Sequence, residues 1–91
     1  MTIAEERIQQ LERQAAAAAT SGQDDLARDY VRRARRIAER YRIQFPRHFE
    51  RFSCDRCDMY LRPGRNCRVR LQGDHLVIAC DCGELARYGY K

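Results

Sequence analysis

Long apolar runs are missing from this 91-residue sequence, and leucine, isoleucine, valine and phenylalanine are sparse. No stretch is long enough to span a bilayer, and the first twenty residues lack the apolar segment of a secretory signal. We therefore expect a small, intracellular, cytoplasmic protein with no membrane association. A chain this short buries a modest share of its surface, so a metal or a partner often supplements the core.

Lysine is almost absent as well, since seventeen of the eighteen basic residues are arginine. The formal net charge is +5 at pH 7. The guanidinium group of arginine grips phosphates through paired hydrogen bonds and stacks on bases. This bias favours nucleic acid as the partner. An arginine-rich genome would produce the same composition without any such role.

Two helices are predicted in the first half of the chain. Alanine and apolar residues recur at helical spacing over residues 3–20, and a second helix is predicted over about 23–42. Its arginine-rich face either binds nucleic acid or is a solvated surface. Its opposite face is an apolar seam that the alanine-rich first helix covers only in part, which leaves area for a partner protein. The seam consists of Leu26, Tyr30, Ala34, Ile37 and Tyr41.

The second half of the chain carries two cysteine pairs. Cys54 and Cys57 have C-x-x-C spacing, and Cys80 and Cys82 form a shorter pair that precedes a glycine. Residues i and i+2 of an extended strand point to the same face, so the shorter pair can still aim at one ion. In a reducing compartment, clustered cysteines indicate metal ligands before disulfides. We expect one structural Zn²⁺ on these four cysteines, because four thiolates leave no open coordination position.

The fifth cysteine, Cys67, lies between the two pairs. The segments "NCRVRL" and "HLVIAC" flank a Gly73-Asp74 turn and predict a hairpin in which Cys67 faces Cys80. Cys67 is then either a substitute ligand or a small residue packed beneath the site, and the complete set of four favours packing. The predicted fold class is α+β: an αα-hairpin at 1–45, a linker at 46–53, and a zinc ribbon of short antiparallel strands at 54–91.

Three stretches resemble the archaeal RNase P protein component 4 family, the zinc-ribbon subunits of ribonuclease P. They are "LARDYVRRARRIAERYRI" (26–43), "CDRCDMYLRPGRNCRVRL" (54–71) and "CDCGELARYGY" (80–90). The resemblance covers almost the whole chain, and the middle block is the most specific. The second cysteine pair departs from the family's C-x-x-C-G, which affects the local knuckle geometry more than the fold.

The resemblance implies a non-catalytic role within a ribonucleoprotein that trims the 5′ leader of precursor tRNA. In that family the RNA is the catalyst, and the protein binds its specificity domain together with protein component 1. The two N-terminal helices contact component 1, precursor tRNA is met indirectly, and basic residues around the ribbon contribute to RNA binding. The residues themselves agree, since they offer no carboxylate cluster, no nucleophile with a base and no open metal position.

The candidate RNA contacts in this sequence lie around the ribbon. Asn66 either reads a base edge or caps a turn, and the turn is favoured. Phe49, Phe52 and Tyr60 could stack on unpaired bases, although packing over the small ribbon core is favoured for at least two of them. The candidate contacts are Arg47, Arg51, Arg62, Arg65, Asn66, Arg68, Arg70 and Arg87.

Two other functions share these sequence features. A transcription-type zinc ribbon that binds DNA or a polymerase subunit would carry the same cysteines and charge, and preference for structured RNA over duplex DNA separates it from the first hypothesis. An adaptor that binds only protein would show weak salt dependence.

Overall fold

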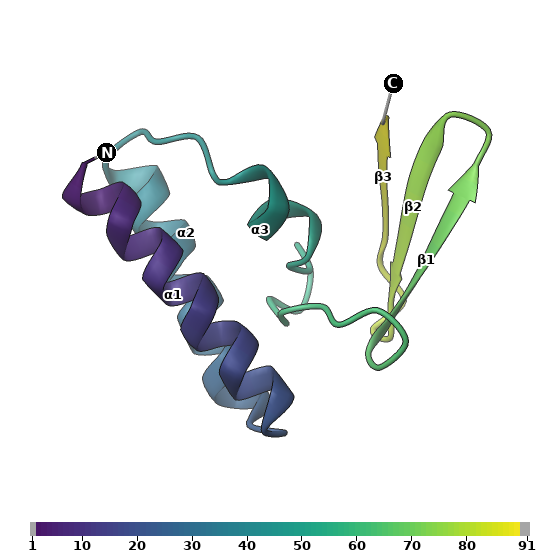
Figure 1. The fold of residues 1–91 in the computed structure, drawn as a ribbon, viewed down its shortest axis with the longest axis horizontal. Helices are drawn as coiled ribbons and strands as arrows, with labels where there is room; N and C mark the ends of the chain where they lie inside the picture. Colours follow the sequence, from purple (N-terminus) through teal and green to yellow (C-terminus); the bar gives the residue numbers. More distant parts are fainter. Residues whose placement is uncertain (1, 90–91) are drawn as a thin grey trace.

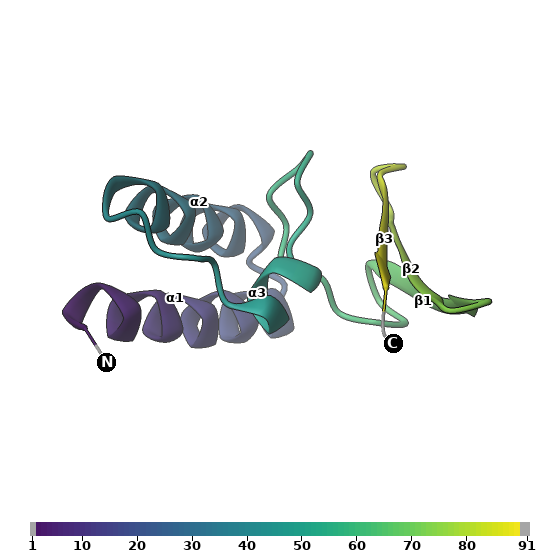
Figure 2. The ribbon, with the colours of Figure 1, turned by 90° about the horizontal axis from the view of Figure 1, so that it is seen from above.

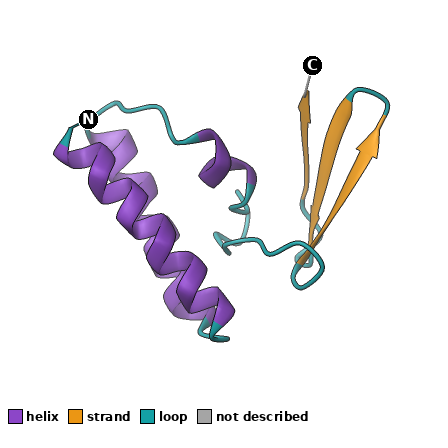
Figure 3. Cartoon of the chain, viewed as in Figure 1, coloured by secondary structure: helices purple, strands orange, loops and turns teal. Residues whose placement is uncertain are grey.

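The computed structural model describes residues 2–89, in which an antiparallel pair of helices lies at one end and a small sheet at the other (Figures 1 and 2). This arrangement confirms the α+β prediction (Figure 3). Among the described residues, no helix is long and apolar enough to cross a membrane. The elements are α1 (Ile3–Thr20), α2 (Asp24–Arg40), α3 (Arg47–Arg51), β1 (Cys67–Gln72), β2 (His75–Cys80) and β3 (Leu85–Gly89).

Both ends of α1 are capped by local sequence. The Thr2 hydroxyl accepts a hydrogen bond from the Glu5 amide at 3.2 Å, and the Glu5 carboxylate accepts one from the Thr2 amide at 3.1 Å, which is a capping box. The Thr2 amide and hydroxyl lower the pKa of Glu5. At the other end, Gly22 has φ of 76° and the Gln23 amide reaches the Ala18 carbonyl at 2.9 Å, as in a Schellman motif.

The two helices meet along small side chains. Ala15 of α1 and Ala27, Val31 and Ala34 of α2 are 0% exposed. Alanine has no side chain beyond Cβ, so the helix backbones can approach closely.

The predicted seam of α2 is therefore displaced from the line of closest approach. Ala34 is buried between the helices, whereas Tyr30 and Ile37 pack at the margin of the core. Leu26 is 39% exposed and Tyr41 is 57% exposed. The bulky residues flank the alanine interface because they do not fit within it.

The segment 46–53, expected as a linker, contains the short helix α3. Phe49 is fully buried, and its ring lies 4.6 Å from that of Phe45 and 5.9 Å from that of Tyr60, measured between centroids. Its burial places the segment on the helical core, where it joins the helices to the ribbon. The local sequence is too short to predict a helix without this tertiary contact.

The ribbon hairpin has the predicted register. Cys67 faces Cys80, Val69 faces Ile78, and Leu71 pairs with Leu76. Gly73 has φ of 64° at the first turn position, which suits a two-residue turn with glycine first.

A third strand, β3, was not predicted. It pairs antiparallel with β2 along the edge opposite β1, in the order β1-β2-β3. Its sequence, LARYG, is short and carries no strong strand signal, so the pairing edge of β2 determines it.

Two separate apolar clusters result. The helical cluster spans α1 and α2 and includes Phe49, Met59 and Tyr60. Within residues 2–89, the ribbon cluster has five buried residues: Cys54, Leu61, Cys67, Ile78 and Cys80. Phe52 and Cys57 pack against both clusters, so the segment around the first cysteine pair connects the two halves.

Candidate metal centre and nucleic-acid interface

Four cysteines converge between the helices and the sheet. The Sγ atoms of Cys54, Cys57, Cys80 and Cys82 all lie within 4.8 Å of one another. The Cys54–Cys82 sulfur pair is 3.5 Å apart and the Cys57–Cys80 pair is 3.7 Å apart. A tetrahedral ion with metal–sulfur bonds of about 2.3 Å places its sulfurs about 3.8 Å apart. The predicted set therefore has a geometry that can bind a metal ion.

A tight turn orients the two thiols of each cysteine pair. In the first turn, the Cys57 amide donates to the Cys54 sulfur at 3.4 Å, and the Asp58 amide donates to the Cys54 carbonyl at 2.9 Å. Asp58 adopts φ of 61°, a left-handed conformation that aspartate tolerates better than most residues. In the second turn, Gly83 has φ of 100° and its amide donates to the Cys80 carbonyl at 2.9 Å. Glycine accommodates this angle without strain, so the short C-x-C-G pair forms a closed turn.

The protonation of these thiols depends on their surroundings. Burial raises the pKa of Cys54 and of Cys80. A backbone hydrogen bond at Glu84 lowers the pKa of the exposed Cys82 to about 7. Neutral thiols are favoured at the buried positions, and a bound cation would be needed to hold all four as thiolates.

Cys67 lies outside the group of four. It is 2% exposed and packs in the ribbon cluster opposite Cys80. Burial, and secondarily the Asp81 carboxylate, raises the pKa of its thiol. These surroundings are those of a small apolar core residue.

An arginine clamp that the sequence did not reveal joins α2 to the first cysteine pair. Nη1 of Arg35 contacts the Asp58 carboxylate, which also accepts a hydrogen bond from Arg32 Nε at 2.9 Å. Nη2 of Arg35 donates to the Cys54 carbonyl at 3.1 Å and to the Ser53 hydroxyl at 3.2 Å. Part of the predicted arginine face therefore holds the metal site against the helices. No local signal could have predicted it, because the partners are separated by 18–26 residues.

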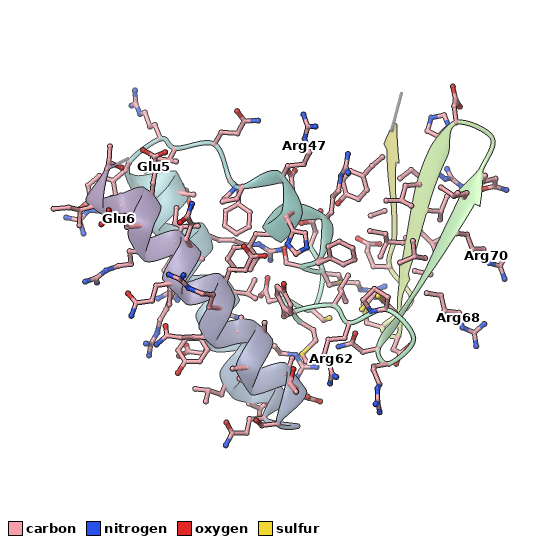
Figure 4. The ribbon with its side chains drawn as sticks, in the orientation of Figure 1. Glu5, Glu6, Arg47, Arg62, Arg68 and Arg70 are labelled. Atoms are coloured by element: carbon pink, nitrogen blue, oxygen red, sulfur yellow. The ribbon has the colours of Figure 1, made fainter. Side chains whose placement is uncertain are left out.

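Three of the predicted RNA contacts share one face of the sheet. The register places Arg70 beside Val77 and Val77 beside Arg87, with Arg68 two residues away on β1. Figure 4 shows Arg68 and Arg70 projecting from β1 away from the helices. All three arginines are exposed, and no described carboxylate lies within ion-pair distance of them. This face, which we call the ribbon arginine face (Arg68, Arg70 and Arg87), is available to an anion.

The other candidates are dispersed or engaged. The Arg62 side chain donates to the Ala19 carbonyl at 3.2 Å and so caps the end of α1. The Asn66 side chain accepts from the Arg62 amide at 2.6 Å and donates to the Tyr60 carbonyl at 3.1 Å, so it stabilises the turn, as favoured. Arg51 lies over the Tyr88 ring, 5.5 Å from its centroid.

Arg47 and Arg65 are exposed. Figure 4 shows Arg47 projecting from the start of α3, well away from Arg68 and Arg70. Of the three rings considered for stacking, Phe49 and Tyr60 are buried and only Phe52 is partly accessible.

Comparison with known proteins identifies the family. Residues 7–83 match the model of the "RNAse P Rpr2/Rpp21/SNM1 subunit domain". The chain belongs to this family. A curated relative from Halobacterium salinarum, "Ribonuclease P protein component 4", is 57% identical over 89 residues, which is 98% of this chain and 96% of the relative. A protein of the same name from Pyrococcus abyssi is 46% identical over 70 residues, 72% of this chain and 60% of the relative.

Solved structures agree with this family membership. A chain of the "cryo-EM structure of archaeal Ribonuclease P with mature tRNA" matches with a TM-score of 0.91 and 42% identity, over 97% of this chain and 77% of the other. The protein of "Pfu Rpp21 structure and assignments" matches with a TM-score of 0.64 and 35% identity, over 93% of this chain and 97% of the other. The resemblance drawn from the sequence is thus confirmed.

Proposed function

We propose that this chain is a non-catalytic, RNA-binding subunit of ribonuclease P that helps the RNA catalyst remove the 5′ leader of precursor tRNA. The ribbon arginine face is the observation that supports RNA binding. Its three guanidinium groups have no ion-pair partner among residues 2–89, so each can contact a phosphate without first breaking an internal pair. In this proposal the face binds the specificity domain of the RNA, and the chain functions in the cytoplasm.

The metal in this proposal is one structural Zn²⁺ held by Cys54, Cys57, Cys80 and Cys82. The sulfur spacing supports it, and cysteine thiolates are the ligands of structural zinc sites. When bound, the ion cross-links the loop before β1 to the end of β2. Four protein ligands fill a tetrahedral ion, so the site orders the ribbon and does not activate water.

The protein partner in this proposal, component 1, binds the helical end. Two of the predicted partner residues, Ile37 and Tyr41, line a groove of about 540 Å³ together with Ile3 of α1. Ile3 is 82% exposed, and the groove also holds Arg36 and Arg40. Exposed apolar groups beside arginines are typical of interface anchors. The chain would then divide its work between a partner-binding region at 1–45 and an RNA-binding ribbon at 54–91, joined by 46–53.

Salt dependence tests the RNA role. Removal of one arginine that binds a phosphate should reduce the slope of log affinity against log salt by about 0.7–0.9. The double variant Arg68→Ala with Arg70→Ala should therefore bind RNase P RNA more weakly and flatten the slope by about 1.4–1.8. Filter binding of the zinc-loaded chain to the RNA over a salt series measures this.

A helix variant provides the control. Arg13 and Arg36 are exposed on α1 and α2. Figure 1 shows these helices at the opposite end of the molecule from the sheet that carries the ribbon arginine face. Replacing both with alanine makes the same charge change and should leave the slope unaltered. A slope that moves with the helix variant and not with the ribbon variant would place the RNA on the helices. An RNase P reconstituted without the chain, compared with one that contains it, should cleave precursor tRNA more slowly.

A further inference from the structure

A second surface with the chemistry of nucleic-acid binding is lined by none of the three residues of the ribbon arginine face. A groove of about 510 Å³ runs between the C-terminal half of α1 and the loop that follows the first cysteine pair. Its lining includes His48, Phe52, Arg62, Pro63 and Arg65. The volume falls within the range of about 300–1,000 Å³ that small-ligand sites occupy.

Two rings form one wall of this groove. The His48 and Phe52 rings lie 5.0 Å apart between centroids and are tilted by 41°. Nδ1 of His48 is 2.8 Å from the Glu12 carboxylate, which orients the imidazole while its side chain stays 69% exposed. Phe52 packs against both apolar clusters, so it is fixed in place. The groove thus presents an oriented, accessible ring backed by a rigid one.

The groove is also positively charged. Arg62 is held by its bond to the Ala19 carbonyl, and Arg65 is exposed with no described carboxylate within ion-pair distance. None of the lining residues is acidic. The Glu12 carboxylate contacts His48 of this wall, and it also accepts a hydrogen bond from the Tyr60 hydroxyl at 3.2 Å. Glu12 is therefore already engaged. Because no carboxylate among the lining residues pairs with the two arginines, the groove favours an anionic ligand.

We propose that this groove binds one unpaired nucleotide of an RNA strand, with the base against the His48 and Phe52 rings and the phosphate on Arg65 and Arg62. Proteins bind single-stranded segments with this combination of aromatic rings and basic groups, and the ring contact tolerates any base. The inference rests on the proposed RNA-binding function, but it places an unpaired nucleotide on a surface separate from the ribbon arginine face.

The test separates the base from the phosphate. The zinc-loaded full chain is titrated with a hexauridylate strand and with an abasic ribose-phosphate strand of the same length. The wild type should prefer the strand with bases by about 5-fold or more, because stacking of one base contributes about 1–3 kcal/mol. His48→Ala should abolish this preference. His48→Phe keeps a ring without the Glu12 contact and should restore most of it.

Two further variants serve as controls. His75→Ala removes the only other histidine, which is exposed at the start of β2, and should leave the preference intact. Arg65→Ala should weaken both strands equally and lower the salt slope by about 0.7.

Several results would overturn the proposal. Equal affinity of the wild type for the two strands, or a preference that survives in His48→Ala, would show that no base enters the groove. Displacement of hexauridylate by hexaglutamate at equal concentration would assign the groove to an acidic peptide. If RNase P RNA still binds with its salt slope while the strands are not discriminated, only this inference fails. If neither the strands nor RNase P RNA bind, the proposed function fails as well.

Discussion

The helical end and the ribbon of this chain are stabilised by different means. In the part of the chain that the structure describes, twelve buried residues form the helical cluster, and the alanine faces of α1 and α2 bring the two backbones close. The ribbon cluster has five buried residues, three of which are cysteines, and Val69 and Leu71 on its apolar face stay 38% and 71% exposed. The helices therefore have a core of ordinary packing, whereas the ribbon has too little buried apolar surface to fold without a cross-link.

The two halves are joined by a short segment of the chain. The sheet does not lie on the helices; α3 and the first cysteine pair lie between them (Figure 2). Arg35 holds this junction from the helical side, and Phe52 packs against both clusters. Perturbing the metal, the junction and the end of α2 in turn tests how independent the halves are.

Removal of the metal should have the largest effect. Structural zinc contributes about 10–16 kcal/mol of apparent binding free energy in small domains, which matches or exceeds the usual stability of a whole domain, about 5–15 kcal/mol. Chelation should therefore unfold β1, β2 and β3 while much of the α1–α2 helicity remains. Far-ultraviolet circular dichroism, with amide NMR of the ribbon, measures the two halves separately.

Cysteine variants sharpen this prediction. Cys80→Ala should lose zinc affinity, whereas Cys67→Ala should keep one equivalent of zinc, because Cys67 is only packed beneath the site. Zinc content by mass spectrometry distinguishes them. If Cys67→Ala empties the site, the fourth ligand has been assigned wrongly. In the chelation experiment, loss of the helical signal together with the ribbon signal would show that the two halves fold as one unit.

The Arg35→Ala substitution should have an intermediate effect. It removes the hydrogen bonds to Asp58, Ser53 and the Cys54 carbonyl. One hydrogen bond to a charged group contributes about 1.5–3 kcal/mol, and water can replace part of this set because the Arg35 side chain is 27% exposed. We expect a loss of about 2 kcal/mol in the free energy of unfolding, measured in urea, and weaker zinc binding.

Arg33→Ala is the matched control for Arg35→Ala. Arg33 pairs with Asp29 one turn away on the exposed face of α2, at 2.8 Å. Such a pair contributes about 0.3–0.5 kcal/mol, and its loss should leave zinc affinity unchanged. Equal effects of the two variants would mean that Arg35 does not couple α2 to the metal site.

The last prediction is a small gain in stability. Arg42 follows α2 with φ of 53°, and the Ile43 amide bonds to the Ala38 carbonyl at 2.9 Å, so Arg42 occupies the position that Gly22 occupies after α1. A left-handed conformation costs a non-glycine residue about 1–2 kcal/mol, and replacement by glycine relieves this strain. Glycine also loses more conformational entropy on folding, which offsets about 0.5–1 kcal/mol of the gain. Arg42→Gly should raise the free energy of unfolding of the helical end by about 0.5–1 kcal/mol. A lower thermal midpoint would contradict this.

Much of this molecule follows from patterns that act over a few residues. The helical spacing of apolar residues predicted both long helices, and the alternation around Gly73 predicted the register that sets Cys67 opposite Cys80. The cysteine spacing predicted the four sulfurs that converge. These features are readable because helix periodicity, strand alternation and turn geometry depend on neighbours in the chain.

Other features were decided by packing between distant segments. The line of closest helix approach runs along Ala27, Val31 and Ala34, because small residues fit where the bulky members of the predicted seam do not. The buried Phe49 ring holds the expected linker against the helical core as α3. Pairing with the free edge of β2 makes a strand of residues 85–89, and it puts Arg87 on the same face as Arg70 with Val77 of β2 between them.

The long-range role of arginine was also beyond sequence reasoning. Arg35 and Arg62 look like their neighbours in the sequence, yet one holds the first cysteine pair and the other caps α1. The sequence alone determined that arginine is abundant and that four cysteines can meet. Only the tertiary structure decided which arginines are engaged inside the protein and which stay exposed, because that depends on acceptors that lie 18–43 residues away along the chain.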